Sequence, residues 1–187
     1  LHDLLAAAAE LRRRGIPFEL DLVGGVEPGS QSGEAVLTSL RSAIHQLGLD
    51  GVVALRGFLP AAGVRSALAA AHLFVAPYVE TASGDKDGIP TALLEAMSTG
   101  LAVVAARSGS IPEVVTDGHD GRLVAAGSPP ELAAAIAGLL LSAADRARLG
   151  EAAARTVRAR FDIAVCEPAL AQRLRALVDA ARRAALT

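Results

Sequence analysis

The chain has little cysteine, little aromatic residue content and almost no net charge. Its 187 residues include one Cys, one Met, one Tyr, four Phe and no Trp, with a formal net charge of −2. The single cysteine, Cys166, excludes an internal disulfide and a cysteine-based metal site. The balanced charge gives no electrostatic reason to expect a nucleic-acid partner. No apolar run approaches the roughly 20 residues of a membrane span.

Metal-binding and dinucleotide-binding patterns are also missing. The four histidines fall in separate elements without ligand spacing, at His2, His45, His72 and His119. We therefore expect no metal site and no bound cofactor. The turn at Gly24-Gly25 does not form the GxGxxG fingerprint, which argues against NAD or FAD. Since nothing resembles a secretory signal and no disulfide is available, we expect a cytoplasmic protein.

What the chain does contain is a regular alternation of short apolar segments and helical patterns. We expect strands at 18–23, 52–55, 73–76, 101–106 and 122–124. We expect helices at 1–14, 33–47, 61–71, from 90 onward, 111–116, from 129 onward, 144–160 and 164–185. Ser128 and Glu131 have the spacing of a capping box. This alternation predicts an α/β fold with a Rossmann-like parallel sheet flanked by helices, which binds ligands at the carboxyl ends of its strands.

Two acidic residues flank the start of the helix at Pro90. Proline suits a first helical turn, so Asp87 and Gly88 lie in the preceding loop and Glu95 lies about a turn and a half inside the helix. The Glu95 side chain leans back toward the helix N-terminus, so both acids can reach one ligand. The first backbone N–H groups, around Ile89 to Thr91, have no internal partners and suit phosphate oxygens.

This arrangement suits a nucleotide sugar. One acid would bind the sugar hydroxyls and the other would bind the ribose diol. The backbone amides would bind the diphosphate. The spacing alone favours the simpler interpretation of a Gly-Pro turn, an acidic charge at a helix start and an exposed helical glutamate.

Five segments, in order, carry a resemblance to one enzyme family. They are RGFLP at 56–60, LFVAPY at 73–78, DGIPTALLEAM at 87–97, GSIPEVV at 109–115 and DGHDGRLV at 117–124. Together they resemble the retaining glycosyltransferases of family 4, whose acidic-x7-acidic motif matches the third segment. The one central departure is Asp87, because the family most often has Glu there. Segment 84–90, GDKDGIP, looks most like members that build bacterial surface or exopolysaccharides.

The resemblance implies the C-terminal, donor-binding half of a GT-B enzyme. The intact enzyme would transfer a hexosyl group from a UDP-, GDP- or ADP-sugar to a hydroxyl of a saccharide or lipid-linked acceptor, with retention and without an essential metal. Asp87 would hold the hexose hydroxyls and Glu95 the ribose hydroxyls. The helix start at Gly88, Ile89, Pro90 and Thr91 would hold the diphosphate.

Two strand-end loops are further candidates for donor contacts. Gly24 follows the first expected strand and could let the backbone approach a ligand, although the sequence alone favours a plain turn. Arg56, Gly57 and Phe58 follow the next strand, where the family's loop meets the nucleobase through backbone groups. An exposed surface charge remains an equal interpretation of Arg56.

The chain begins inside a helical pattern, at Leu1, Leu4 and Leu5. The resemblance implies that residues 1–187 are one domain, and that the first strand and an N-terminal acceptor domain lie outside them. We therefore expect binding without turnover from this chain alone. The helix at 164–185 would cross back to the missing domain, and its arginines allow a peripheral contact with the inner face of the cell membrane. Two alternatives remain: a non-catalytic nucleotide-sugar-binding or regulatory module, and a GT-B relative such as a nucleotide-sugar epimerase or a phosphorylase.

Overall fold

The computed structural model describes residues 1–26, 29–79 and 88–184. Its helices are α1 (His2–Arg13), α2 (Gln31–Gln46), α3 (Ala61–Ala70), α4 (Thr91–Ser98), α5 (Ile111–Val114), α6 (Pro129–Leu141), α7 (Ala143–Arg160) and α8 (Ile163–Ala184). Its strands are β1 (Leu20–Val23), β2 (Val53–Gly57), β3 (Leu73–Ala76), β4 (Ala102–Ala106) and β5 (Arg122–Val124). Each expected element is present, with the predicted ends displaced by two residues or fewer.

The strands form two parallel sheets. Strand β1 pairs with β2, and the second sheet has the order β3-β4-β5. Every pairing is parallel. The expected α/β architecture of parallel strands flanked by helices is confirmed. Within the described residues, however, the two sheets are not hydrogen-bonded to one another, whereas a single sheet was expected.

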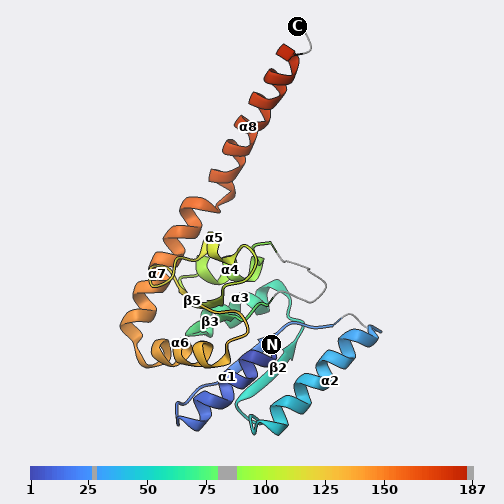
Figure 1. The fold of residues 1–187 in the computed structure, drawn as a ribbon, viewed down its shortest axis with the longest axis vertical. Helices are drawn as coiled ribbons and strands as arrows, with labels where there is room; N and C mark the ends of the chain where they lie inside the picture. The colour runs from blue at the N-terminus through green and yellow to red at the C-terminus, as the bar shows by residue number, and fades with distance from the viewer. Residues whose placement is uncertain (27–28, 80–87, 185–187) are drawn as a thin grey trace.

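Strand β4 is buried along its whole length. Ala102 and Val104 pack on one face, in a core shared with α1 and α6. Val103 and Ala105 pack on the other face, in a core shared with α4 and α5. Because successive side chains of a strand point to opposite faces, a strand covered on both sides must be apolar throughout. Figure 1 shows this layering, with α6 on one side of β3 and β5 and α4 on the other.

Helix α1 connects the cores of the two sheets. Leu4, Ala7 and Leu11 belong to the core formed with α6 and β4. Leu5 and Ala8 belong to a separate core formed with α2, next to β1 and β2. Alternate stripes of one helix therefore pack over both sheets, as its apolar spacing allows.

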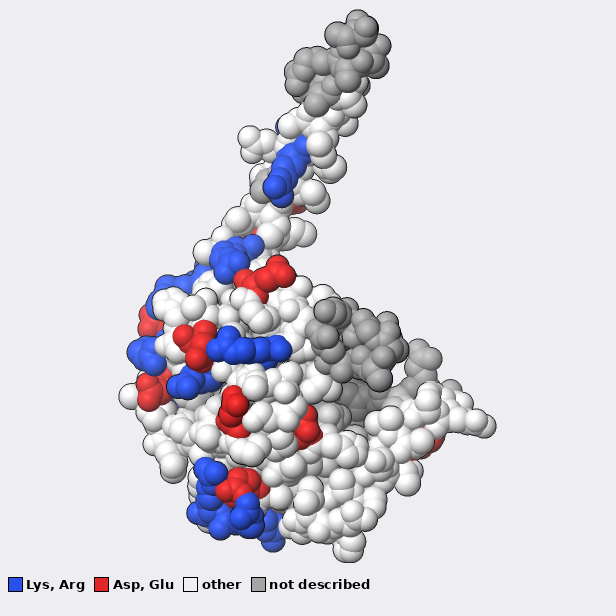
Figure 2. Space-filling view, viewed as in Figure 1, with Lys and Arg blue, Asp and Glu red and all other residues white. Residues whose placement is uncertain are grey.

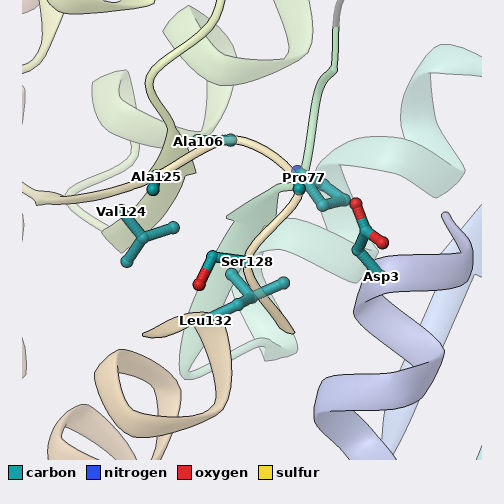
Figure 3. A pocket seen from close by; sticks show the side chains of 8 residues that line it. Asp3, Pro77, Ala106, Val124, Ala125, Ser128 and Leu132 are labelled. Atoms are coloured by element: carbon teal, nitrogen blue, oxygen red, sulfur yellow. The ribbon is translucent and has the colours of Figure 1, made fainter. Parts of the chain in front are cut away.

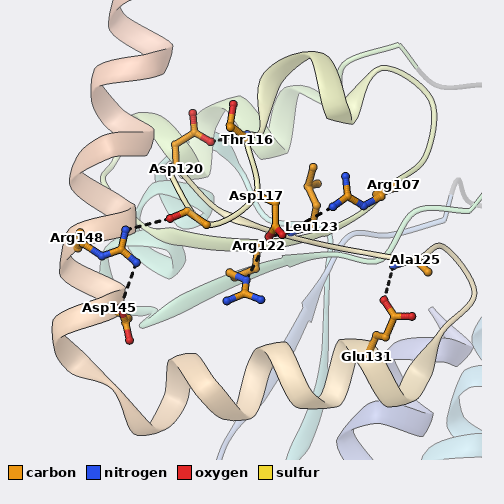
Figure 4. Close-up of polar contacts among 11 residues, drawn as sticks. Arg107, Thr116, Asp117, Asp120, Arg122, Leu123, Ala125, Glu131, Asp145 and Arg148 are labelled. Atoms are coloured by element: carbon orange, nitrogen blue, oxygen red, sulfur yellow. Dashed lines mark hydrogen bonds and ion pairs between the residues drawn. The ribbon is translucent and has the colours of Figure 1, made fainter.

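The loop before β5 is held to α7 by a buried carboxylate. Asp120 is only 2% exposed. It accepts hydrogen bonds from the Thr116 backbone N–H at 2.6 Å and the Thr156 hydroxyl at 2.7 Å. Nearby, Asp117 accepts the Leu123 backbone N–H at 2.9 Å (Figure 4). Burying a carboxylate is tolerable here because both of its oxygens have partners.

The start of α6 differs from the expected capping box. Ser128 is the N-cap residue, but its side chain accepts no backbone hydrogen bond. The Glu131 carboxylate accepts the Ala125 backbone N–H at 2.9 Å, beyond the helix (Figure 4). Pro129 and Pro130 have no N–H groups, so the first turn has fewer donors to cap. Glu131 stabilises the loop after β5 instead.

Helix α8 extends away from the rest of the protein, and the C-terminus lies at its far end (Figure 1). Four apolar side chains on it are 53% to 75% exposed: Ile163, Leu170, Leu174 and Leu177. Their spacing places them along one side of the helix. No helix in the described part of the chain is long and apolar enough to cross a membrane.

Helix α7 approaches the loop at Gly100 closely at its residue Gly150. A Cβ at this position would collide with the carbonyl oxygen of Gly100 and lie 3.2 Å from the Ala102 nitrogen. Both are backbone atoms that cannot rotate away. We expect Gly150→Ala to lower the free energy of unfolding by about 1 to 3 kcal/mol, measured by denaturant titration.

Gly138 of α6 provides the matched control for this prediction. It is exposed, and a Cβ there would have no neighbour within 4 Å. Gly138→Ala should therefore raise the free energy of unfolding by about 0.5 to 1 kcal/mol, from helix propensity alone. If Gly150→Ala were as stable as Gly138→Ala, the close contact between α7 and Gly100 would be wrong.

Candidate functional site

A pocket lies at the carboxyl ends of β3, β4 and β5 (Figure 3). Pro77 follows β3, Ala106 ends β4 and Val124 ends β5, so these strand ends line one side of it. The first turns of α1 and α6 supply Asp3 and Ser128. The complete lining is Asp3, Pro77, Ala106, Val124, Ala125, Gly127, Ser128 and Leu132. The position agrees with the general rule for ligand binding on parallel α/β sheets.

Asp3 and Ser128 were not among the predicted site residues. Figure 3 shows Asp3 beside Pro77, with Ser128 nearer to Val124. The sequence placed each of them near the start of a helix. Their meeting at one sheet edge depends on how α1 and α6 pack, which no local pattern reveals.

The start of α4 presents unpaired backbone donors. Pro90 is the N-cap residue, with φ −63° and ψ 123°, so the helix begins one residue after it rather than including it. The Leu93 N–H donates to the Pro90 carbonyl at 3.0 Å. The amides of Thr91 and Ala92 have no partner among the residues that the structure describes. They lie at the positive end of the helix dipole.

Glu95 shares the exposed side of α4 with these amides. The opposite side of the helix is buried, through Leu93, Ala96 and Met97. Thr91 and Glu95 are both exposed. Residues four apart lie above one another on a helix, so Glu95 is ~6 Å along the axis from Thr91. Within the described parts of the chain, the Glu95 carboxylate makes no hydrogen bond or ion pair.

Asp87 lies outside the described residues. Its expected approach to Glu95 therefore stays a prediction. Gly88, the first described residue after this gap, is exposed, and a Cβ on it would meet nothing within 4 Å. Ile89 packs against the core below α4. The start of α4 is thus anchored on one side by an apolar contact.

The ends of β1 and β2 form a second group. The Gly24 N–H donates to the Gly57 carbonyl at 2.9 Å. A Cβ on Gly25 would lie 3.1 Å from the Phe58 nitrogen. This close approach between loops accounts for glycine at position 25 without a ligand. The role predicted for Gly24 in donor binding stays a prediction.

The Phe58 side chain is exposed, whereas the Arg56 side chain makes an ion pair with a neighbouring strand. The Phe58 side chain is 83% exposed, which is unusual for an aromatic ring. The Arg56 Nε donates to Asp21 Oδ1 at 2.8 Å, and both side chains are about half exposed. Asp21 lies on β1 opposite Ala54, so Arg56 reaches it diagonally across the strand pair. The sequence did not identify Asp21 as this partner.

Charged side chains of both signs are interleaved on the visible face (Figure 2). On α7, Arg148 pairs with Asp145 at 3.2 Å and Arg155 with Glu151 at 2.7 Å. Hydrogen bonds from Ser142 and Arg148 lower the pKa of the exposed Asp145 below its usual value.

Within residues 1–26, 29–79 and 88–184, no group of three or more His, Cys, Asp or Glu side chains could hold a metal ion.

Comparison with known proteins identifies relatives among bacterial polysaccharide enzymes. The chain is 34% identical over 137 residues to a Salmonella typhimurium protein named as the colanic acid biosynthesis glycosyltransferase WcaL, covering 73% of this chain and 32% of WcaL. It is 32% identical over 173 residues to the amylovoran biosynthesis glycosyltransferase AmsK of Erwinia amylovora, covering 92% of this chain and 40% of AmsK. The chain therefore spans well under half the length of these relatives.

A solved structure of another protein has a fold similar to that of this chain. HepE from Anabaena, in complex with UDP, superimposes with a TM-score of 0.80 and 27% identity, covering 94% of this chain and 44% of HepE. HepE has also been solved in complex with UDP-glucose. The expected GT-B fold is confirmed, as is the expected likeness to exopolysaccharide enzymes.

The family itself follows from a match over most of the chain. A family model described as "Glycosyl transferases group 1" matches residues 1–142, from the first residue of the chain to the residue after α6. The match includes the pocket at the strand ends and the exposed side of α4. The chain belongs to the group 1 glycosyl transferases.

Proposed function

We propose that this chain binds a nucleotide-diphosphate sugar at the start of α4. The intact enzyme transfers its hexosyl group, with retention of configuration, to a hydroxyl of a saccharide or lipid-linked acceptor in polysaccharide or glycoconjugate biosynthesis. The observation that carries the proposal is the start of α4, where the Thr91 and Ala92 amides have no partner among the described residues and the exposed Glu95 lies one turn further along the helix. The UDP and UDP-glucose complexes of HepE support the choice of ligand class.

The helix start would act on charge that develops during the reaction. When the bond between the anomeric carbon and the diphosphate breaks, negative charge grows on the diphosphate oxygens. Backbone N–H groups at a helix N-terminus are fixed donors with a positive potential, so they stabilise this charge without reorganising. Thr91 and Ala92 supply such donors in α4. This role needs no proton transfer from the protein.

The acidic side chains would position the donor. A carboxylate has acceptor sites for both hydroxyls of a ribose diol, and charged acceptors make the stronger hydrogen bonds. We assign that contact to Glu95 and the hexose hydroxyls to Asp87. The loop at Arg56, Gly57 and Phe58 would face the nucleobase. No general base, metal or further cofactor is assigned.

Acceptor binding and cellular location are properties of the whole polypeptide, not of residues 1–187 alone. The chain spans 32% of WcaL and 40% of AmsK, so most of each relative lies outside the matched part. We place acceptor binding in an N-terminal domain of the same polypeptide and expect donor binding without turnover from residues 1–187 alone. The enzyme would act in the cytoplasm, at the inner face of the cell membrane.

The first prediction concerns the donor. Calorimetric titration of the full polypeptide with UDP-, GDP- and ADP-sugars should show one nucleotide binding at least about tenfold more tightly than the others, because base edges differ in their hydrogen-bond donors and acceptors. Absence of binding for all three would contradict the proposal. Tight binding without sugar transfer to any acceptor would favour the non-catalytic module.

Replacing Glu95 should weaken nucleotide binding. Glu95→Ala removes the carboxylate from the ribose hydroxyls, so affinity for the free nucleotide should fall by about 1 to 3 kcal/mol, measured by calorimetry. Glu151→Ala is the matched control, because it removes an exposed glutamate of the same charge from α7. If both variants bind as tightly as the parent, Glu95 does not contact the ribose.

Replacing Asp87 should weaken binding of the nucleotide sugar more than binding of the free nucleotide. Asp87→Ala should weaken binding of the nucleotide sugar by about 1 to 3 kcal/mol and leave binding of the free nucleotide nearly unchanged. The same calorimeter measures both ligands on one variant. Equal losses for the two ligands would remove Asp87 from the hexose subsite.

A further inference from the structure

Strand β5 lies at one end of the sheet β3-β4-β5, so its outer edge has no strand partner within the described residues. Its inner edge is paired with β4, and the Arg107 N–H donates to the Val124 carbonyl at 2.8 Å. Alternate residues along a strand direct their backbone groups to opposite sides. The N–H groups of Leu123 and of the next residue but one, Ala125, therefore point to the outer edge.

Carboxylates, and not a strand, hold both of these outward N–H groups. The Leu123 N–H donates to Asp117 Oδ1 and the Ala125 N–H to Glu131 Oε2, each at 2.9 Å (Figure 4). Asp117 lies in the turn before β5, and Glu131 lies in the first turn of α6 after it. Each carboxylate is six residues from its amide. The segments on either side of β5 thus close its outer edge.

Two arginines fasten Asp117 to the sheet whose edge it covers. Arg122 Nε lies 3.2 Å from Asp117 Oδ1, and the Arg107 guanidinium lies 3.8 Å from Asp117 Oδ2. Arg122 belongs to β5 and Arg107 directly follows β4. The three side chains are between 39% and 52% exposed, so these ion pairs add little to stability. Their consequence is to keep the carboxylate beside the Leu123 amide.

An open edge strand is a place where a second chain can add. Free N–H and C=O groups along an edge accept a further strand, and proteins block such edges with charged side chains. Two identical edges pair in antiparallel orientation across a two-fold axis, so that the same surface serves in both copies. For β5 the donors in such a pairing are the Leu123 and Ala125 amides, and both are occupied.

We propose that Asp117 and Glu131 form an autoinhibitory contact that prevents a second copy of this chain from pairing with β5. Each carboxylate acts at a high effective concentration, because a separation of six residues keeps it next to its amide. A strand of another molecule has to displace both carboxylates before it can pair. The inference concerns backbone pairing at β5 and does not depend on the donor or on the start of α4.

The first experiment measures association of the full polypeptide without nucleotide. Asp117→Ala combined with Glu131→Ala removes both acceptors. Asp117→Asn combined with Glu131→Gln is the matched control, because it removes the same two charges and keeps an acceptor oxygen at each position. In sedimentation velocity at about 10 to 100 μM chain, we expect the alanine variant to form dimers in a fraction that rises with concentration. We expect the control to sediment as the parent does.

The second experiment is residue-resolved amide hydrogen exchange by NMR, which tests each contact separately. Asp117→Ala should speed the exchange of Leu123 by at least about tenfold and leave that of Ala125 unchanged, and Glu131→Ala should do the reverse. In the double alanine variant, both amides should exchange more slowly at high than at low concentration, because a second copy then pairs with them. This dependence distinguishes dimers formed at β5 from association through α8.

Four results would overturn the proposal. The first is a double alanine variant that is folded by circular dichroism and sediments as the parent does at every concentration. The second is equal dimer formation by the control, which would assign the barrier to charge. The third is dimer formation without slower exchange at Leu123 and Ala125. The fourth is unchanged exchange of these amides in the single alanine variants, which decides the question even if the double variant does not fold. Each of these results leaves the donor-binding proposal unaffected.

Discussion

Burial of β4 on both faces is the constraint that positions the rest of the protein. Its small apolar side chains, from Ala102 to Ala106, allow helices to pack closely on each side. Helix α7 approaches the backbone just before this strand so closely that only glycine fits at position 150. On one face of the strand, α4 turns Leu93 and Met97 inward. This packing leaves Glu95 on the exposed side of the helix.

The elements and the exposed side of α4 could be predicted from sequence because both depend on local periodicity. Short apolar segments separated by helical patterns indicate strands and helices within a few residues. Leu93 and Met97 are four apart and belong to one face, which leaves Glu95 on the other. The unpaired amides followed from Pro90, since a helix must begin near a proline that cannot continue the hydrogen-bond ladder.

The features that sequence did not predict all depend on contacts between distant segments. Asp3 reaches the pocket only because α1 packs beside the end of β3. Arg56 meets Asp21 because β1 and β2 pair in one particular register. Glu131 accepts a hydrogen bond from Ala125 because the loop after β5 lies against the start of α6. The division of the strands into two sheets likewise depends on which edges meet, and strand patterns carry no information on neighbours.

Helix α8 has a consequence for handling the protein. Ile163, Leu170, Leu174 and Leu177 lie along one side of a helix that stands apart from the body (Figure 1). Water-exposed apolar surface of this kind favours self-association. A net charge of −2 provides weak electrostatic repulsion against it. The colloidal behaviour of the separate 187-residue chain is therefore governed by this helix, and charged substitutions along it are the direct route to concentrated, monodisperse samples.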